Sequence, residues 1–270
     1  MGKATKTMPE NLTTMFRMDG KTAVVFGGAG GLGEAIAKGL AAFGANVVIA
    51  SRKEDALKKA VEEIKPHADG GAKVSYQVCD ATVDAQVEAV KDAVIKEFGS
   101  VEILVCSQGF NRKHDVVDFN MDDFDAMLQT NVRSVFVCNK VFGKVFKENG
   151  YGKIVDVTSV RDQIATFPGG GNAGYCATKG ALTSIIKQCA TELAPEVTVN
   201  GIGPTVTLTP MMESIVPKEA QEVSIPADHP LGRMAKPEDI VGAAVYLCSD
   251  ASCYHTGQVL YPDGGLLCKG

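Results

Sequence analysis

The sequence feature that most constrains the fold is a glycine-rich segment between an apolar run and an amphipathic one. Residues 22–26, TAVVF, have the composition of a buried strand, and residues 33–43 carry apolar side chains at helical spacing. Glycine permits a tight turn here and lets backbone N–H groups approach an anion at the helix N-terminus. The turn includes Gly27, Gly31, Leu32 and Gly33. This order predicts a unit that binds the pyrophosphate of a dinucleotide; the alternative is a tight connection that binds nothing.

Beyond this turn, strand-type apolar runs alternate with helical patterns, and no low-complexity linker or fixed-period repeat interrupts them. Such alternation is typical of a parallel sheet with helices on both faces. The expected strands are 22–26, 46–50, 73–79, 102–107, 153–158, 198–202 and 258–261, and the expected helices are 33–43, 54–64, 85–98, 122–147, 174–193 and 237–247. We therefore predict an α/β fold, a single-domain Rossmann-type, doubly wound parallel sheet of seven strands.

The chain is expected to form one domain over residues 20–270, preceded by a polar N-terminal extension over residues 1–19. Domains of the α/β class and of this length commonly stay single. Helical periodicity is lost in residues 205–234, which are rich in Pro, Met and Ser. Because long irregular segments of compact domains are often lids or binding loops, we predict a substrate loop there.

The composition argues against several kinds of partner. The net charge is −5 and no run of Lys or Arg exceeds two residues, so nucleic acid is not an expected partner. No apolar stretch approaches the roughly 18 residues of a membrane span, and residues 1–20 lack a secretory signal. We expect a cytoplasmic protein with no membrane partner and with reduced cysteines. The eight Cys and four His show no ligand spacing, so no metal site is expected.

The end of the second expected strand indicates which dinucleotide binds. A carboxylate at that place bonds the adenosine ribose and repels a 2′-phosphate. Here Ser51 occupies the place, and Arg52 and Lys53 follow it with charges that suit a phosphate dianion. We predict NADP(H) as the preferred cofactor and NAD(H) as the alternative. The competing interpretation of the two cations is a solvent-exposed pair at the start of a helix.

A tyrosine and a lysine open the long helical run after the fifth expected strand. Tyr175 and Lys179 are four residues apart, so they lie on one helix face and their polar groups can share one space. A free phenol ionises near a pKa of about 10, and a neighbouring ammonium lowers that pKa. The fifth strand leads into Ser159, with Thr158 as the alternative hydroxyl. The pair alone is common on helix surfaces, but with a hydroxyl at a strand end it indicates proton transfer to an alcohol or carbonyl.

Taken in order, these motifs resemble those of the short-chain dehydrogenase/reductase family over residues 20–265. The spacing Gly27-x3-Gly31-x-Gly33 is similar to the family's glycine turn. The set that resembles its catalytic Asn-Ser-Tyr-Lys tetrad is Asn131, Ser159, Tyr175 and Lys179. The chain departs from the family pattern at Phe26, where Thr is usual, in the segment CSQG over residues 106–109, and at Thr205, where Gly is usual.

The resemblance implies further contacts with the cofactor. Asp80 and Ala81 correspond to the pair that bonds the adenine ring, and Gly109 to a position of close approach. Pro204 and Thr209 belong to a segment that resembles the family's holder of the nicotinamide carboxamide. The family resemblance also implies a homotetramer.

The same resemblance implies a hydride transfer between a nicotinamide and an alcohol or ketone. Tyr175 would exchange the hydroxyl proton, and Ser159 would bond the substrate oxygen. Lys179 would lower the pKa of Tyr175 and bond the nicotinamide ribose. Asn131 would kink its helix and hold a water that relays the proton onward from the lysine.

The substrate is expected to be a small molecule that meets a basic segment. Residues 109–114, GFNRKH, follow the fourth expected strand directly and, with residues 171–182, look most like gluconate 5-dehydrogenase-like members of the family, which act on sugar acids or polyols. Arg112 and Arg161 are the candidate substrate contacts, with a solvated rim as the alternative.

Two other functions compete with the sugar-acid interpretation. One is reduction of an apolar ketone of the hydroxysteroid or 3-oxoacyl type, for which Met211, Met212 and Ile215 would line a pocket. The other is a non-catalytic dinucleotide-binding sensor of redox state, which the departures at Phe26, 106–109 and Thr205 would favour.

Overall fold

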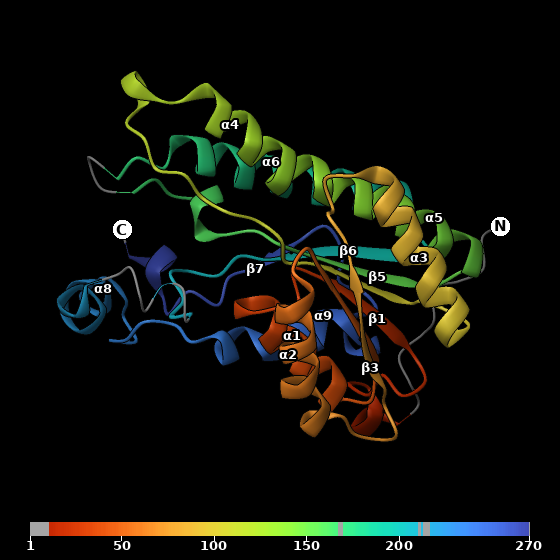
Figure 1. The fold of residues 1–270 in the computed structure, drawn as a ribbon. Coiled ribbons are helices and arrows are strands. Elements are labelled where there is room, and N and C mark those ends of the chain that lie inside the picture. Colours follow the sequence, from red (N-terminus) through yellow and green to blue (C-terminus); the bar gives the residue numbers. More distant parts are fainter. Residues whose placement is uncertain (1–10, 167–169, 210–211, 213–216, 270) are drawn as a thin grey trace.

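The computed structural model describes residues 11–166, 170–209, 212 and 217–269. Its centre is one seven-stranded sheet in the order β3-β2-β1-β4-β5-β6-β7, and every neighbouring pair is parallel. Helices cover both faces of this sheet (Figure 1). The predicted fold class is confirmed. Because the strand order reverses between β1 and β4, a crevice is expected at their carboxyl ends.

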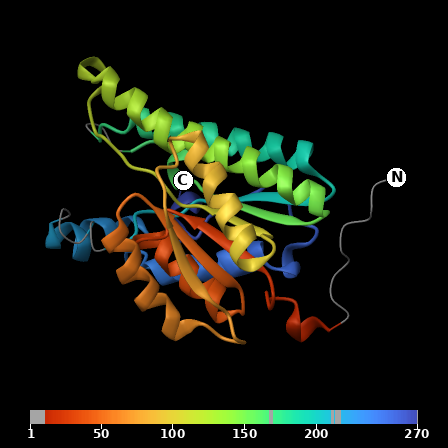
Figure 2. The ribbon, with the colours of Figure 1, turned by 45° about the vertical axis from the view of Figure 1, so that its right-hand side comes forward.

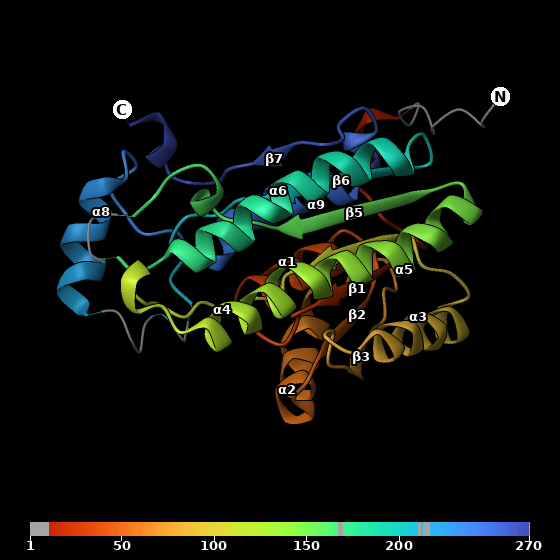
Figure 3. The ribbon, with the colours of Figure 1, turned by 90° about the horizontal axis from the view of Figure 1, so that it is seen from above.

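The strands match the expected apolar runs, with ends shifted by a residue or two. Strand β1 has the predicted bounds, and β7 is the shortest. The strands are β1 (Thr22–Phe26), β2 (Asn46–Ser51), β3 (Val74–Val78), β4 (Ile103–Cys106), β5 (Gly152–Val157), β6 (Val197–Ile202) and β7 (Val259–Leu260). Their carboxyl ends point to the end of the molecule where α8 and the C-terminal residues lie (Figure 3).

One face of the sheet is covered by α3, α4, α5 and α6 (Figures 1 and 3). Their bounds are Asp84–Phe98, Met121–Leu128, Ser134–Asn149 and Ala173–Leu193. The single helix predicted over 122–147 is wrong in one respect, because a π-helical turn, Gln129–Arg133, separates α4 from α5. A π turn inside a helix commonly marks a functional position.

The other face is covered by α1, α2 and α9, with bounds Gly31–Ala42, Glu54–Ile64 and Val241–Cys248. The helix expected over 237–247 begins as a 3-10 turn, Pro237–Ile240, with proline in its first turn. Further 3-10 turns are Leu12–Thr14, Lys65–His67, Val116–Asp118, Val160–Asp162, Asp250–Ser252 and Leu266–Cys268. In Figure 2 the turn Leu12–Thr14, near the first described residues, lies far from α8 and on the side of the amino ends of the strands.

Alternate residues of each strand enter two apolar cores. Val25, Ile49 and Val105 pack against α1, α2 and α9, whereas Val24, Val48 and Leu104 pack against α3, α5 and α6. Met18, from the expected N-terminal extension, is fully buried in the first core. The sheet therefore needs helices on both faces, because both faces are apolar.

The segment 205–234 is less irregular than predicted. Residues 218–228 are helical and include a π turn, Ala220–Ser224, and α8, Ile225–Asp228. Its sequence lacks the apolar period of a helix packed on a sheet, which explains why the pattern did not indicate one. Within the described residues, no helix is both long and apolar enough to cross a membrane.

A phenylalanine in α5 tests the second core. Phe142 is fully buried, and its ring lies 5.9 Å from that of Phe26 and 6.2 Å from that of Phe146. We expect Phe142→Ala to lower the free energy of unfolding by about 3–5 kcal/mol, because it leaves a cavity. Val78→Ala, on edge strand β3 with 52% exposure, should cost less than about 1 kcal/mol. Urea unfolding of both variants measures the difference, and equal losses would contradict this packing.

Candidate active site and dinucleotide cleft

The glycine turn brings three strands' ends and one helix start together. Gly27 has a φ of 75°, and a Cβ there would lie 2.7 Å from the backbone nitrogen of Gln108. A Cβ at Gly33 would overlap the carbonyl oxygen of Gly27, and one at Gly28 would lie 2.7 Å from Ile49 Cγ2. Glycine is required at these places because the turn lies too close to β2 and to the residues after β4 to leave room for a Cβ. The N-terminus of α1 is thereby exposed as an anion site.

A single cleft runs along the carboxyl edge of β1, β2 and β4. Most of the predicted cofactor residues line it, namely Gly27, Gly31, Ser51, Arg52, Lys53, Asp80, Ala81, Gly109 and Thr209. Leu32 packs partly buried against the first core, and Pro204 is buried after β6. The glycine cradle, which a Cβ would fill, and the open helix N-terminus fit a dinucleotide pyrophosphate.

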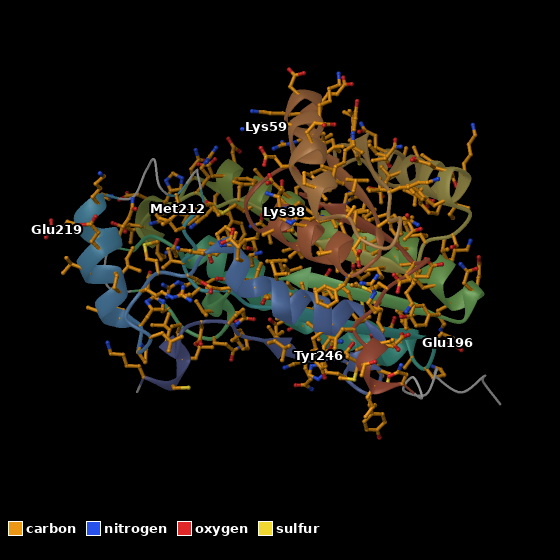
Figure 4. The ribbon with its side chains drawn as sticks, turned by 90° about the horizontal axis from the view of Figure 1, so that it is seen from below. Lys38, Lys59, Glu196, Met212, Glu219 and Tyr246 are labelled. Carbon is orange, nitrogen blue, oxygen red and sulfur yellow. The ribbon has the colours of Figure 1, made fainter. Side chains whose placement is uncertain are left out.

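Two further cations line the cleft, and neither of them was predicted from the sequence. Lys38 and Lys59 extend from the neighbouring helices α1 and α2 (Figure 4). Lys38 is paired with Glu34 at 2.7 Å, whereas Arg52 and Lys53 are exposed. Helical period identifies Lys38 and Lys59 as polar-face residues but not which helix face borders a cleft. Arg52 and Lys53 follow Ser51 directly, and Lys38 and Lys59 line the same cleft.

Asp80 forms a turn as well as part of the cleft. Its Oδ1 accepts hydrogen bonds from the backbone N–H of Thr82 at 2.9 Å and from the Thr82 hydroxyl at 2.7 Å. These bonds lower the pKa of Asp80, so the carboxyl is ionised at neutral pH. Asp80 can therefore form this turn and still border the cofactor cleft.

Asn131 lies fully buried in the π turn between α4 and α5. Its Oδ1 accepts from the backbone N–H of Phe110 at 2.9 Å, and its Nδ2 donates to the Phe110 carbonyl at 2.8 Å and to the Thr178 hydroxyl at 3.2 Å. The side chain thereby joins the loop after β4 to α6. A Cβ at Gly109 would lie 3.2 Å from Asn131 Oδ1 and 3.7 Å from Lys179 Nζ.

The strand end and α6 bring the other three predicted catalytic residues together. Ser159 follows β5, and its hydroxyl is hydrogen-bonded with Tyr175 and accepts from the Arg161 N–H at 3.2 Å. Lys179 Nζ lies 5.5 Å from the centre of the Tyr175 ring and donates to the Val157 carbonyl at 2.8 Å. Thr158 donates its hydroxyl to the Ile202 carbonyl instead, so Ser159 is the hydroxyl beside Tyr175.

Burial dominates the electrostatics of this group. It raises the pKa of Tyr175 to about 12, which the hydrogen bond with Ser159 partly opposes. It also lowers the pKa of Lys179 to about 8, against the charges of Asp156 and Asp162. Desolvation of the phenol is the largest effect on the pKa of Tyr175, and its lowering by Lys179 stays a prediction.

The departures from the family pattern each have a local partner. Phe26 is buried and packs edge-on against Phe142. Gln108 donates to the Ser134 hydroxyl at 3.1 Å. Thr205 Oγ1 lies 2.8 Å from His229 Nε2, and His229 Nδ1 lies 2.7 Å from the Ile225 carbonyl. His229, which sequence reasoning missed, thus ties the end of α8 to the loop after β6.

The predicted substrate contacts lie in different surroundings. The charge of Arg161 acts on the Tyr175 phenol, and its Nη1 donates to the Ala165 carbonyl at 2.7 Å. The Arg112 side chain is 60% exposed, lies over the Phe110 ring and borders the cofactor cleft. Met212 is described, but Met211 and Ile215, from the proposed apolar pocket, lie outside the described residues.

Comparisons with known proteins place this geometry in a family. The family model described as Enoyl-(Acyl carrier protein) reductase matches residues 27–267. Gluconate 5-dehydrogenase of Gluconobacter oxydans is 35% identical over 254 residues, which are 93% of this chain and 96% of that protein. The 3alpha-hydroxysteroid dehydrogenase of Mediterraneibacter gnavus is 33% identical over 253 residues, which are 93% of this chain and 98% of that protein.

A solved structure agrees in fold as well as in sequence. The gluconate 5-dehydrogenase of Burkholderia cenocepacia J2315, in complex with NADP and tartrate, has a TM-score of 0.88 and 30% sequence identity, and the match covers 96% of this chain and 100% of that chain. Sequence and fold agree with these relatives along nearly the whole length of the chain. The chain belongs to the short-chain dehydrogenase/reductase family of oxidoreductases.

Proposed function

We propose that this chain transfers a hydride between the nicotinamide of NADP(H) and a secondary alcohol or ketone, and that the substrate is a sugar acid or polyol. The observation that carries this proposal is the buried group at the end of β5. Tyr175 is hydrogen-bonded with Ser159, lies beside Lys179 and feels the charge of Arg161. A phenol, a hydroxyl and two cations at one point suit an oxygen that gains or loses a proton.

Each side chain has a distinct part in the proposed reaction. Tyr175 holds the proton that the substrate oxygen gains or loses, and Ser159 donates a hydrogen bond to that oxygen as its charge develops. Lys179 stabilises negative charge on the phenol and bonds the nicotinamide ribose. Asn131, fixed between Phe110 and Thr178, holds the loop and helix that enclose the lysine. A bound nicotinamide supplies or accepts the hydride.

The cations at the adenosine end support NADP(H) over NAD(H). Arg52 and Lys53 follow Ser51 at the cleft and are exposed, and Lys59 borders the same cleft. A 2′-phosphate dianion gains from such charges, and the place where a carboxylate would repel it holds a hydroxyl. The Burkholderia cenocepacia relative, solved with NADP, is consistent with this choice.

The proposed substrate class follows from Arg161. The positive charge of its guanidinium helps to lower the pKa of the Tyr175 phenol. An arginine also binds a carboxylate in a defined orientation. We assign to Arg112 a second, outer contact and to residues 205–234 the cover of the substrate. Reduction of an apolar ketone is the second candidate, favoured by the hydroxysteroid dehydrogenase relative. Cofactor binding without turnover of any polyol, sugar acid or apolar ketone would favour the sensor instead.

We also propose a homotetramer formed through α5 and α6. The groove between these helices is lined in part by Phe136, Cys189 and Leu193, and Phe136 is 49% exposed. An apolar groove of this kind is suited to a second copy of the chain.

Replacing the phenol tests the proposed proton transfer. We expect Tyr175→Phe to lower kcat by about 10²- to 10⁴-fold, because the proton donor is lost, and to leave the Kd for NADPH within about twofold. Tyr254→Phe, which alters a fully exposed tyrosine, is the matched control. Absorbance at 340 nm and cofactor fluorescence give the two values. A near-normal kcat for Tyr175→Phe would contradict the proposal.

A carboxylate at residue 51 tests the cofactor preference. Ser51→Asp should move the ratio of kcat/KM for NADP over NAD by about tenfold or more toward NAD, because it repels the 2′-phosphate. Ser51→Asn, of the same size but neutral, should move the ratio much less. The assignment fails if the aspartate and asparagine variants have the same ratio as the unaltered chain.

Removing the inner arginine tests the substrate class. Arg161→Gln should raise KM for gluconate by about tenfold or more, since a hydrogen bond to a charged group contributes about 1.5–3 kcal/mol. The neutral polyol sorbitol serves as the matched substrate, and its KM should change by less than about twofold. Equal changes for the two substrates would show that Arg161 does not bind the carboxylate.

A further inference from the structure

A carboxylate lies buried inside the sheet, next to the catalytic lysine. Asp156 is in β5 between the apolar residues Val155 and Val157, and it has no exposed surface. Its strand neighbours are Cys106 on β4 and Gly201 on β6. A charge in such a place is costly unless a partner stabilises it.

Hydrogen bonding alone does not explain an aspartate here. Asp156 Oδ2 accepts a hydrogen bond from Asn139 Nδ2 at 2.7 Å. Asp156 Oδ1 is also buried and has no hydrogen bond of good geometry among the described residues, although the neighbouring Cys106 thiol also helps to lower the pKa of the carboxyl. An asparagine would fill the same space and accept the same bond from Asn139 without the desolvation cost of an anion. The negative charge therefore needs a reason other than packing.

The nearby cation is Lys179. Its Nζ donates to the carbonyl of Val157, the residue after Asp156, at 2.8 Å. The lysine is only 4% exposed, and Asp156 is the charge that most opposes the effect of burial on its pKa. Burial raises the pKa of Asp156, and this rise is opposed by the hydrogen bond from Asn139, by Cys106 and by the ammonium of Lys179.

The other groups around this pair do not replace either charge. Cys106 on β4 and Cys189 on α6 interact with Asp156, and among the described residues Lys179 is the cation that acts on its carboxyl. Burial raises the pKa of Cys106 well above its ordinary value, so it remains a neutral thiol. Asp162 also acts on Lys179, but it accepts hydrogen bonds from the hydroxyls of Thr183 and Tyr261.

We propose that Asp156 is a positioning residue for Lys179, and that its buried carboxylate is the counter-charge that keeps the lysine an ammonium inside the closed site. Asn139 holds the carboxylate in place through its 2.7 Å bond. This inference rests on the proposed function, because it explains how Lys179 keeps the charge that Tyr175 and the ribose require. It extends the catalytic group by one buried residue that does not touch the substrate.

The sign of the effect on pH dependence follows from burial. Burial raises the pKa of Asp156 to about 7 and lowers the pKa of Lys179 to about 8, and the charge of each residue opposes the shift of the other. Removing the carboxylate lowers the pKa of Lys179 further. The ammonium is then lost at a lower pH, and activity that depends on it falls earlier as pH rises.

The pH profile of ketone reduction by the NADPH-loaded chain tests this directly. We expect Asp156→Asn to move the alkaline limb of kcat/KM to lower pH by about one unit, a usual effect of a nearby charge. Asp250→Asn is the matched control, because Asp250 is a partly buried carboxylate paired with Lys21 and Tyr151 at the other end of the sheet. Its profile should follow that of the unaltered chain. Superimposable profiles for all three proteins would overturn the proposal.

A titration that needs no turnover separates this inference from the proposed function. Carbon-13 NMR of the full chain with labelled aspartate carboxyls follows Asp156, identified by its absence in Asp156→Asn. In Lys179→Met the titration midpoint of Asp156 should rise by about one pH unit, because the coupling of two charges is reciprocal. An unchanged midpoint would overturn the charge pairing even if the chain reduces the substrate. If the Asp156 midpoint rises in Lys179→Met but the unaltered chain turns over no substrate, the charge pairing is supported and the proposed function is rejected.

Discussion

The hydrogen bond from Lys179 to the Val157 carbonyl ties α6 to the carboxyl end of β5. Parallel strands end at one edge of their sheet, so this bond places the lysine at the edge that also carries the glycine turn. Tyr175 lies one helical turn earlier and meets Ser159, the second residue after the strand. The dinucleotide cleft, at the ends of β1, β2 and β4, and the candidate group of Ser159, Tyr175 and Lys179, at the end of β5, therefore lie along the same edge of the sheet.

Local periodicity predicted the parts of the fold that local packing determines. β1 and α2 have the predicted bounds because their apolar residues alternate or recur without interruption. The break at Gln129–Arg133 was not predictable from period, because Asn131 makes it by bonding the backbone of Phe110, a contact distant in sequence. The helical residues 218–228 do not pack a face on the sheet, so no apolar stripe marked them.

The spacing of the sequence predicted which candidate residues lie close together, but it did not predict their pKa values. Spacing brought Ser159, Tyr175 and Lys179 together correctly because strand ends and helix faces have fixed geometry. It did not show that burial raises the pKa of the phenol. Nor did it assign a part to Asp156, although a carboxylate between two valines is a visible signal in the sequence.

The central claim is that the group around Tyr175 moves a proton while a bound nicotinamide exchanges a hydride. The most direct measurement uses NADPH that carries deuterium at C4, incubated with the chain and 5-ketogluconate, followed by mass spectrometry of the product. In ordinary water, the predicted result is deuterium at the new carbinol carbon, transferred from one face of the nicotinamide. With unlabelled NADPH in heavy water, no deuterium should appear at that carbon. A product whose carbinol hydrogen comes from solvent would contradict the account.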